Sequence, residues 1–311
     1  MKDLKELLPD MRRVLIPVDK SDASERAIKF AACLLAPLSE VVTEEIILLH
    51  VLGTSFIEKM AANIDTRVTE LIKSPLFKQL TEEYIAKEIK PLFLEAEEVF
   101  KKAGVKCAIK KEYIEGDPTK EITNFASMHD IRTIIMGRRR RSALKEKVLG
   151  SCSYAVTHRP GRHSDYIVGQ EDINHSMAPK ILVPFDGSES ATNALREASG
   201  LAQAFPGKVS IKVLYVIESA YLSSLSEEEK EVLKKAQDFF SQNGISEREI
   251  ETEIRYGDPA EEIVKTAEEG QFNIIMMGRT GKSGLKELIL GSVSSRVLHL
   301  AERQTVALIS A

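Results

Sequence analysis

A glycine-rich segment near the end of the chain has the composition of a phosphate-binding loop. Residues 278–284 read Gly-Arg-Thr-Gly-Lys-Ser-Gly, and residues 291–293 read Gly-Ser-Val at the expected start of a helix. Glycine lets the backbone approach a phosphate closely, and the first turn of a helix offers unpaired N–H groups at the positive end of its dipole. The segment therefore predicts an anion site that is built mainly from backbone.

Two better-known nucleotide motifs fit this chain less well. Gly281-Lys282-Ser283 resembles the end of a P-loop, but Met276 stands where that motif requires its first glycine. Asp186-Gly187-Ser188 follows an expected strand without the Gly-x-Gly-x-x-Gly fingerprint of dinucleotide-binding proteins. His163-Ser164-Asp165 carries the letters of a catalytic triad, but a triad is a spatial arrangement, and contiguous letters do not predict one.

The elements that must position the glycine loop occur twice along the chain. So many matching segments in the same order indicate a tandem duplication. The matching pairs are residues 14–21 with 181–188, 48–52 with 213–217, Gly116-Asp117-Pro118 with Gly257-Asp258-Pro259, 134–137 with 275–278, and Leu149-Gly150-Ser151 with Leu290-Gly291-Ser292.

Each copy alternates short β-rich runs with helical periodicity. In the second copy we expect strands at 180–185, 209–217, 251–255, 273–277 and 305–309, with helices at 188–205, 226–243, 259–269 and 292–301. Strands that alternate with helices predict a parallel sheet covered on both faces. The expected fold is therefore α/β, with two tandem doubly wound domains of five parallel strands each.

The expected domains are residues 1–170 and 180–311, joined by a polar, aperiodic linker at 171–179. The first copy also carries an insertion over about residues 54–74. Its apolar residues recur at steps of three or four, which predicts an amphipathic helix. Such a helix could fold back on its own domain or present a surface to a partner.

The spacing from Gly278 through Gly281 to Gly291-Ser292 resembles that of the universal stress protein family, whose ATP-binding members carry this motif after the fourth strand. Both copies share the resemblance, apart from the insertion. It implies a Rossmann-like fold of the adenine nucleotide alpha-hydrolase type. It also implies ATP as the ligand, with Mg²⁺ or Mn²⁺ held mainly by phosphates and water.

The resemblance also assigns residues to the parts of the nucleotide. It implies that Asp186 and the backbone of Val216 lie beside the adenine and ribose, and that Gly278 lies near the ribose. Around the phosphates it implies Gly281, Gly291, Ser292 and Val293. Ser292 would also suit the N-cap of the helix that follows. No catalytic residue and no protein metal ligand is expected.

The first copy departs from this glycine pattern. Arg140 stands where the second copy has Gly281, and Lys20 stands where it has Gly187. A side chain at the second glycine would crowd the path of the phosphates. We therefore expect a degenerate copy that does not bind ATP. The alternative is that Arg138-Arg139-Arg140-Arg141 holds an anion directly through guanidinium groups.

The function expected from these features is that of an ATP-binding regulator or sensor in the stress response, with one nucleotide site in the second copy. A first alternative is slow ATP hydrolysis or phosphoryl transfer, including self-phosphorylation. Against it, the sequence offers no placed general base, arginine finger or dedicated metal carboxylate. A second alternative is a structural binding module without nucleotide, against which the intact glycine spacing argues.

The two copies are expected to pair as a pseudo-dimer through their last strands, at 165–168 and 305–309, which leaves a further homodimer open. The formal net charge of −4 disfavours a specific nucleic-acid partner. The apolar run at 46–52 is too short for a membrane span, and the N-terminus lacks the apolar stretch of a signal peptide. With three widely spaced cysteines, a cytoplasmic location is expected.

Overall fold

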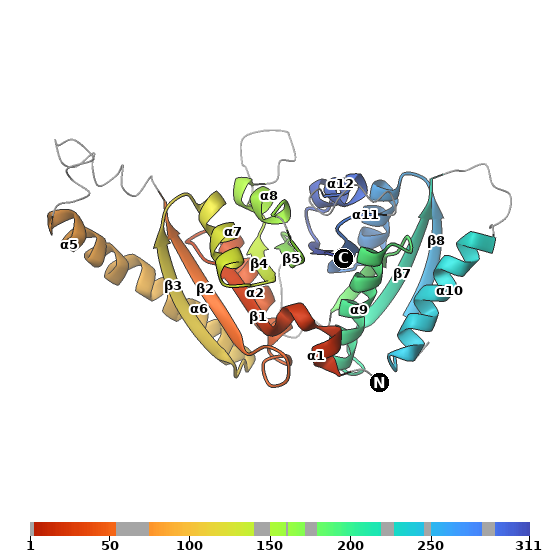
Figure 1. Ribbon diagram of the computed structural model, residues 1–311, viewed down its shortest axis with the longest axis horizontal. Coiled ribbons are helices and arrows are strands. Elements are labelled where there is room, and N and C mark those ends of the chain that lie inside the picture. The colour runs from red at the N-terminus through yellow and green to blue at the C-terminus, as the bar shows by residue number, and fades with distance from the viewer. Residues whose placement is uncertain are drawn as a thin grey trace.

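In the computed structural model the two copies lie side by side and share one ten-stranded sheet (Figure 1). The structure describes residues 3–53, 75–139, 150–159, 161–171, 179–218, 227–245, 250–281 and 290–311. The strand order is β3-β2-β1-β4-β5-β10-β9-β6-β7-β8, so each copy contributes a block of five strands in the same relative order. The expected α/β fold with two doubly wound five-stranded units is confirmed.

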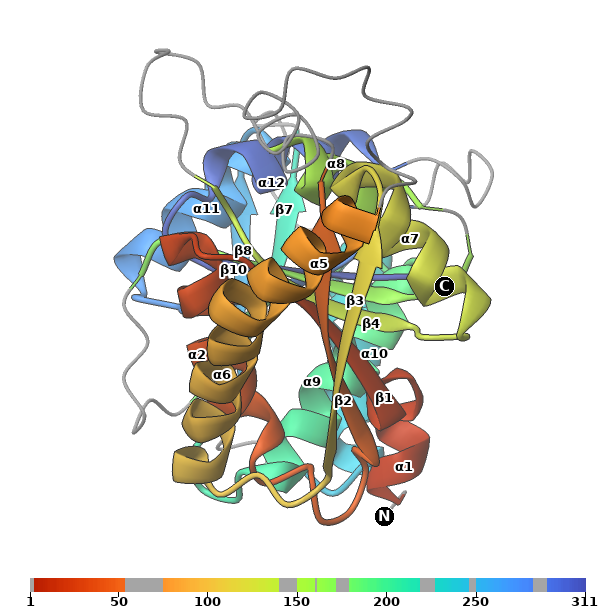
Figure 2. The same cartoon turned by 90° about the vertical axis from the view of Figure 1, so that its left-hand side faces the viewer.

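The elements of the first copy alternate as the repeat predicts. They are β1 (Arg13–Pro17), α2 (Asp22–Leu35), β2 (Glu45–Leu52), α5 (Pro75–Tyr84), a π-helical turn (Ile85–Ile89), α6 (Lys90–Ala103), β3 (Ala108–Glu115), α7 (Pro118–Met128), β4 (Thr133–Gly137), α8 (Ser151–Thr157) and β5 (Ser164–Val168). In Figure 2 this copy faces the viewer, with α5 and α6 beside the edge strand β3.

The second copy repeats this order within one or two residues of the predicted boundaries. Its elements are β6 (Lys180–Pro184), α9 (Glu189–Ala204), β7 (Ser210–Ile217), α10 (Glu227–Gln242), β8 (Ile250–Tyr256), α11 (Pro259–Glu269), β9 (Ile274–Gly278), α12 (Ser292–Leu300) and β10 (Thr305–Ile309).

Strands within each copy are parallel, and the two copies are joined by one antiparallel pair. β5 pairs with β10, with Tyr166 directly opposite Ala307. The predicted pairing of the last strands is therefore confirmed. It turns two sheets of five into one sheet and leaves neither inner edge exposed, which removes a site for pairing with foreign strands.

The central strands are buried on both faces, and their successive residues enter two different cores. Ile181 and Val183 of β6 pack in the core that contains α2, α6, α9 and α10. Leu182, between them, packs in the core that contains α7, α8, α11 and α12. Because a strand points successive side chains to opposite faces, an uninterrupted apolar run is what a doubly covered strand requires.

Matching turns place the helix starts of both copies at the carboxyl edge of the sheet. Ser21 and Ser188 cap α2 and α9, each accepting a hydrogen bond from the backbone N–H three residues later. Gly116 and Gly257 have φ of +146° and +142°, which side chains rarely adopt. This conformation explains why a glycine precedes the Asp-Pro start of the next helix in each copy.

The segment before β1 packs against the opposite copy, which the sequence did not predict. α1 (Leu4–Leu7) lies against α9 (Figure 1). A Cβ added to Gly200 of α9 would lie 2.5 Å from Cγ of Leu8. Because Gly200 has no side chain, the N-terminal segment can pack directly against α9.

Several predictions fall on parts of the chain outside the described residues. These are the helix at 54–74, most of the linker at 171–179, and the segment that contains Arg140 and Arg141. Among the helices of the described residues, none combines the length and the apolar composition that crossing a bilayer demands.

Candidate functional site

A cavity of about 420 Å³ lies at the carboxyl edge of the second copy, where β6, β7 and β9 end and where α9, α11 and α12 begin. Carboxyl ends of parallel strands share one edge of a sheet, and ligands bind there in open α/β folds. All the residues that the sequence assigned to the site line this one cavity. They are Asp186, Val216, Gly278, Gly281, Gly291, Ser292 and Val293.

Asp186 forms the turn between β6 and α9 and also faces the glycine loop. Its Oδ1 accepts a hydrogen bond of 2.9 Å from the backbone N–H of Ser188, as in an Asx turn. A Cβ added to Gly281 would lie 3.0 Å from Oδ2 of the same carboxylate. A side chain at 281 would therefore crowd the Asp186 carboxylate, and the φ of Gly281 is not positive.

The N-terminus of α12 supplies the backbone groups expected of an anion site. Gly291, with φ −61° and ψ 152°, is the N-cap of α12, and within the described part of the chain no side chain caps this helix. The expectation that Ser292 is the N-cap is therefore wrong, because Ser292 is already the first helical residue. An uncapped helix start leaves its first N–H groups available to water or a ligand.

Gly278 has a packing role that the sequence did not reveal. A Cβ at this position would lie 2.5 Å from Oγ of Ser190 and 2.7 Å from the backbone nitrogen of Ala191. The end of β9 therefore approaches the first turn of α9 too closely for any side chain. Oγ of Ser190 donates to the carbonyl of Thr280, and this bond ties the glycine loop to α9.

Sequence reasoning missed other residues that line the cavity. They include Tyr215 and Glu218 at the end of β7, Thr280 in the glycine loop, and Pro259 and Ile263 of α11. The repeated Gly-Asp-Pro turn was the available signal for α11, because it marks a helix that starts at the same edge of the sheet. Asp258 and Glu261 form ion pairs with Arg296, so α11 is joined to α12 across this wall.

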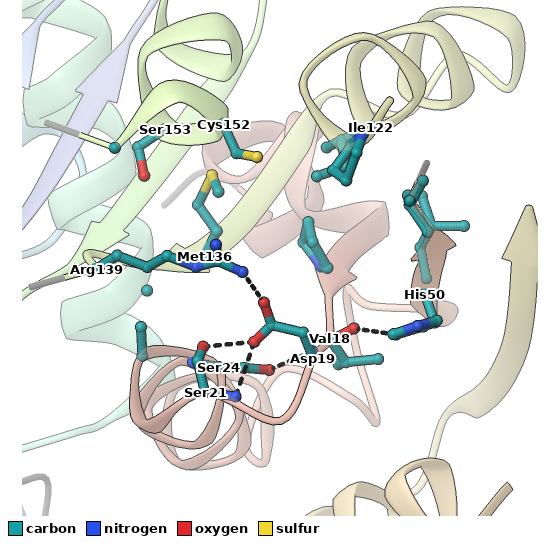
Figure 3. A pocket seen from close by; sticks show the side chains of 18 of the residues that line it. Val18, Asp19, Ser21, Ser24, His50, Ile122, Met136, Arg139, Cys152 and Ser153 are labelled. Atoms are coloured by element: carbon teal, nitrogen blue, oxygen red, sulfur yellow. Dashed lines mark hydrogen bonds and ion pairs between the residues drawn. The ribbon is translucent and has the colours of Figure 1, made fainter. Parts of the chain in front are cut away.

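The first copy keeps an equivalent cavity of about 410 Å³, in which the guanidinium of Arg139 contacts the carboxylate of Asp19 (Figure 3). Arg139, which stands where the second copy has Thr280, forms an ion pair with Asp19. Ser21 donates to Asp19 from both its backbone N–H and its hydroxyl. Burial raises the pKa of Asp19, but the hydrogen bond from Ser21 and the charge of Arg139 outweigh burial and lower it.

His50 lines the same first-copy cavity and corresponds to Tyr215 in the second copy. Its Nδ1 lies 2.8 Å from the carbonyl oxygen of Val18 (Figure 3). Burial lowers the pKa of His50, so the ring is neutral at neutral pH. The two cavities are therefore similar in volume and place, but their polar groups differ.

Arg138 does not fit the alternative in which the arginine run at 138–141 holds an external anion; Arg140 and Arg141 of that run lie outside the described residues. Arg138 is buried, and its guanidinium donates to the carbonyl of Leu298 at the end of α12 in the opposite copy. Arg279, its counterpart, donates to the carbonyl of Thr157 at the end of α8. A cation at the carboxyl end of a helix is favoured by the unpaired carbonyls and the helix dipole. Both arginines therefore hold the two copies together.

Acidic groups are sparse around the second-copy cavity. Among its described lining residues, Asp186 and Glu218 are the only carboxylates. In the described part of the chain, no three histidine, cysteine, aspartate or glutamate side chains gather as a metal site would require. The arrangement therefore offers backbone donors for an anion and, at Asp186, a carboxylate that can accept from hydroxyl groups.

Comparison with known proteins gives consistent matches in sequence and in structure. The sequence model of the universal stress protein family matches residues 11–160 and again residues 177–308. A universal stress protein of Methanocaldococcus jannaschii is 36% identical over 139 residues, which are 40% of this chain and 79% of that protein. One from Bacillus subtilis is 33% identical over 143 residues, which are 40% of this chain and 95% of that protein.

A solved structure matches the whole two-copy arrangement. The crystal structure of a universal stress protein from Archaeoglobus fulgidus has a TM-score of 0.67 to this chain, with 23% identity. The match covers 96% of this chain and 98% of that one. At this identity, the likeness concerns the fold.

Proposed function

The chain belongs to the universal stress protein family, and we propose that its second copy binds ATP and that it acts as a nucleotide-dependent regulator in the stress response. The observation that carries the proposal is the cavity at the ends of β6, β7 and β9. There the glycine loop, the Asp186 carboxylate and the uncapped start of α12 face one space of about 420 Å³.

The proposed pose follows from the chemistry of each wall. The α12 N-terminus and the backbone at Gly281 and Gly291 suit the phosphates, because backbone N–H groups and a helix dipole favour negative charge. Asp186 suits the ribose hydroxyls, because a carboxylate accepts hydrogen bonds. The backbone of Val216 borders the region left for adenine. A Mg²⁺ or Mn²⁺ ion bound with ATP would be held by phosphates and water.

Slow ATP hydrolysis remains an alternative that the described residues support less well. In-line attack on the γ-phosphate needs a group that orients water and cations that neutralise the developing charge. Arg279 belongs to the glycine-rich loop, but its guanidinium is directed to Thr157 and Asp165 in the contact between the copies. We therefore propose binding and regulation in preference to catalysis.

The experiment is a calorimetric titration of the full chain with Mg-ATP, beside the Gly281→Arg variant. This substitution copies Arg140 of the first copy into the second, so the fold should accept it. We expect wild type to bind ATP and Gly281→Arg to lose binding without a change in circular dichroism. Gln242→Arg, an exposed change at the end of α10, controls for the added charge and should bind normally.

Two results would contradict the proposal. Wild type that binds no adenine nucleotide would favour a structural module without nucleotide. A wild type that turns over ATP steadily, with turnover lost in Gly281→Arg, would instead establish the enzyme alternative.

A further inference from the structure

The contact between the two copies has the geometry of a twofold dimer, but the side chains at its centre are not symmetric. In the repeat, Tyr166 of β5 corresponds to Ala307 of β10, and these two residues face each other in the antiparallel pair. A pseudo-twofold axis therefore passes between them. Beside it pack α2 and α9, in which Phe30 corresponds to Glu197.

Four side chains meet at this axis and fit one another in a single combination. They are Tyr166, Ala307, Phe30 and Glu197. The Tyr166 hydroxyl donates to Oε1 of Glu197, and the Ser164 hydroxyl donates to Oε2 at 2.9 Å. The Phe30 ring lies 6.0 Å from the Tyr166 ring, centroid to centroid. Ala307 leaves the space opposite Tyr166. All four lie among buried residues, so a polar group here must find its partner inside the contact.

Like-with-like pairing would bring together side chains that do not fit. Two first copies would place two Tyr166 and two Phe30 side chains at one axis, which overfills it and leaves two buried hydroxyls without a carboxylate. Two second copies would place two Glu197 carboxyls beside two Ala307 methyl groups. That pairing would leave a void and two buried carboxyls without the tyrosine donor.

A second polar group shows the same asymmetry. Asp165 is completely buried and lies 3.1 Å from Nη2 of Arg159, 3.1 Å from Nε2 of His163 and 3.3 Å from Nη1 of Arg279. Its counterpart in the second copy is Val306. Two paired second copies would therefore bury each Arg279 without this carboxylate, and removing one partner of a buried ion pair is costly.

We propose that this surface recognises the opposite copy and rejects a like copy. The residues that encode the choice are Tyr166 with Ala307 and Glu197 with Phe30, supported by Asp165. The surface of the first copy fits a second copy. This second copy can belong to the same chain or, if two chains exchange copies, to another chain. A homodimer of the chain must then use another surface.

The experiment follows the exchange of copies after the covalent link has been cut. A protease site is placed in residues 172–178 of the full chain, and the folded protein is cleaved there. Mild urea lets the two fragments dissociate and re-pair, and native mass spectrometry then counts the complexes. For wild type we expect almost only unlike pairs.

The informative variant removes the asymmetry. In Tyr166→Ala with Glu197→Phe, both copies carry alanine and phenylalanine at the axis, so like and unlike pairs become equivalent there. We expect the share of unlike pairs to fall clearly below that of wild type. Random pairing of two species would give about one half, and the Asp165–Arg279 ion pair, which this variant keeps, holds the share above that value. Tyr113→Ala with Glu268→Phe makes the same changes at exposed positions and should keep the wild-type result.

The outcomes decide the proposal even if the double variant does not fold. Wild-type fragments that form like pairs freely, or that stay monomeric, overturn the proposal directly. A folded Tyr166→Ala, Glu197→Phe variant that still forms only unlike pairs overturns the assignment to these residues.

Discussion

Ser292 and Gly281 face the same cavity but would act on a nucleotide in different ways. Gly281 provides space beside Asp186, whereas Ser292 offers one hydroxyl at the start of α12. We expect Ser292→Ala to weaken ATP binding by about a few-fold to a hundred-fold, since a hydrogen bond contributes roughly 0.5–1.5 kcal/mol, or up to about 3 kcal/mol to a charged group. Titration calorimetry measures this loss.

The order of the two effects tests the account of the site. Gly281→Arg should lose more affinity than Ser292→Ala, because a blocked cavity excludes every part of the phosphate chain. Normal binding by Gly281→Arg together with no binding by Ser292→Ala would show that the glycine loop is not the phosphate cradle.

Glu197 makes the stability of the molecule depend on pH. Burial raises the pKa of Glu197 to about 7, against an ordinary value of 4.5, although Tyr166 and Ser164 donate to it. The folded chain therefore holds a proton that the unfolded chain has lost, and stability falls as pH rises between these values. We expect the contribution of Glu197 to the free energy of unfolding to be about 3 kcal/mol smaller above pH 7 than below pH 4.5.

Glu197→Gln isolates this effect, because it keeps an oxygen that can accept from Tyr166 and removes the charge. Urea unfolding of both proteins, from below pH 4.5 to above pH 7, should show wild type losing stability relative to the variant. The quantity to compare is the difference in unfolding free energy between the two proteins at each pH. Burial also lowers the pKa of His163, and this makes the stability of both proteins rise with pH, opposite to the effect of Glu197. Parallel curves for the two proteins would contradict the prediction.

Among the elements, α9 shows how a helix can depend on a glycine in its interior. In an isolated helix, replacing glycine with alanine stabilises by about 1 kcal/mol. At Gly200 the added methyl group would lie 2.5 Å from Cγ of Leu8 and 3.1 Å from Cβ of Leu7. We therefore expect Gly200→Ala to destabilise the chain by about 1–3 kcal/mol in chemical unfolding, because overpacking displaces the N-terminal segment.

A double-mutant cycle with Leu8→Ala separates crowding from helix propensity. With the Leu8 side chain shortened, Gly200→Ala should be neutral or stabilising. An increase in stability for Gly200→Ala in the wild-type background would show that the N-terminal segment does not depend on this close approach.

For the whole molecule, the difference between the two cavities predicts one bound ATP per chain. Their volumes are nearly equal, but Arg139 pairs with Asp19 in the first copy, whereas the second copy has Thr280 at that place. Titration should therefore saturate at one equivalent. Gly281→Arg serves as the control, since it should bind none. Two equivalents in wild type, or one equivalent left in the variant, would place a nucleotide in the first copy.

The sequence by itself determined the layout of this molecule. Local patterns were sufficient for this, because apolar runs, glycine turns and capping residues act over a few positions and occur twice along the chain. The gathering of Asp186, Val216, Gly281 and Ser292 around one cavity also followed, because parallel strands bring their carboxyl ends to one edge. The pairing of β5 with β10 followed from the repeat and the resemblance.

Only the tertiary structure decided which partner each polar side chain takes. Arg138 belongs to a run of four arginines that could hold an anion, yet it reaches a carbonyl of the opposite copy. Glu197 is a charged residue in a helix, and nothing in its local sequence indicates that it lies buried against Tyr166. Such partners are distant in the chain, and a buried charge or hydroxyl takes the donors and acceptors that packing brings to it. Sequence periodicity carries no information about those contacts.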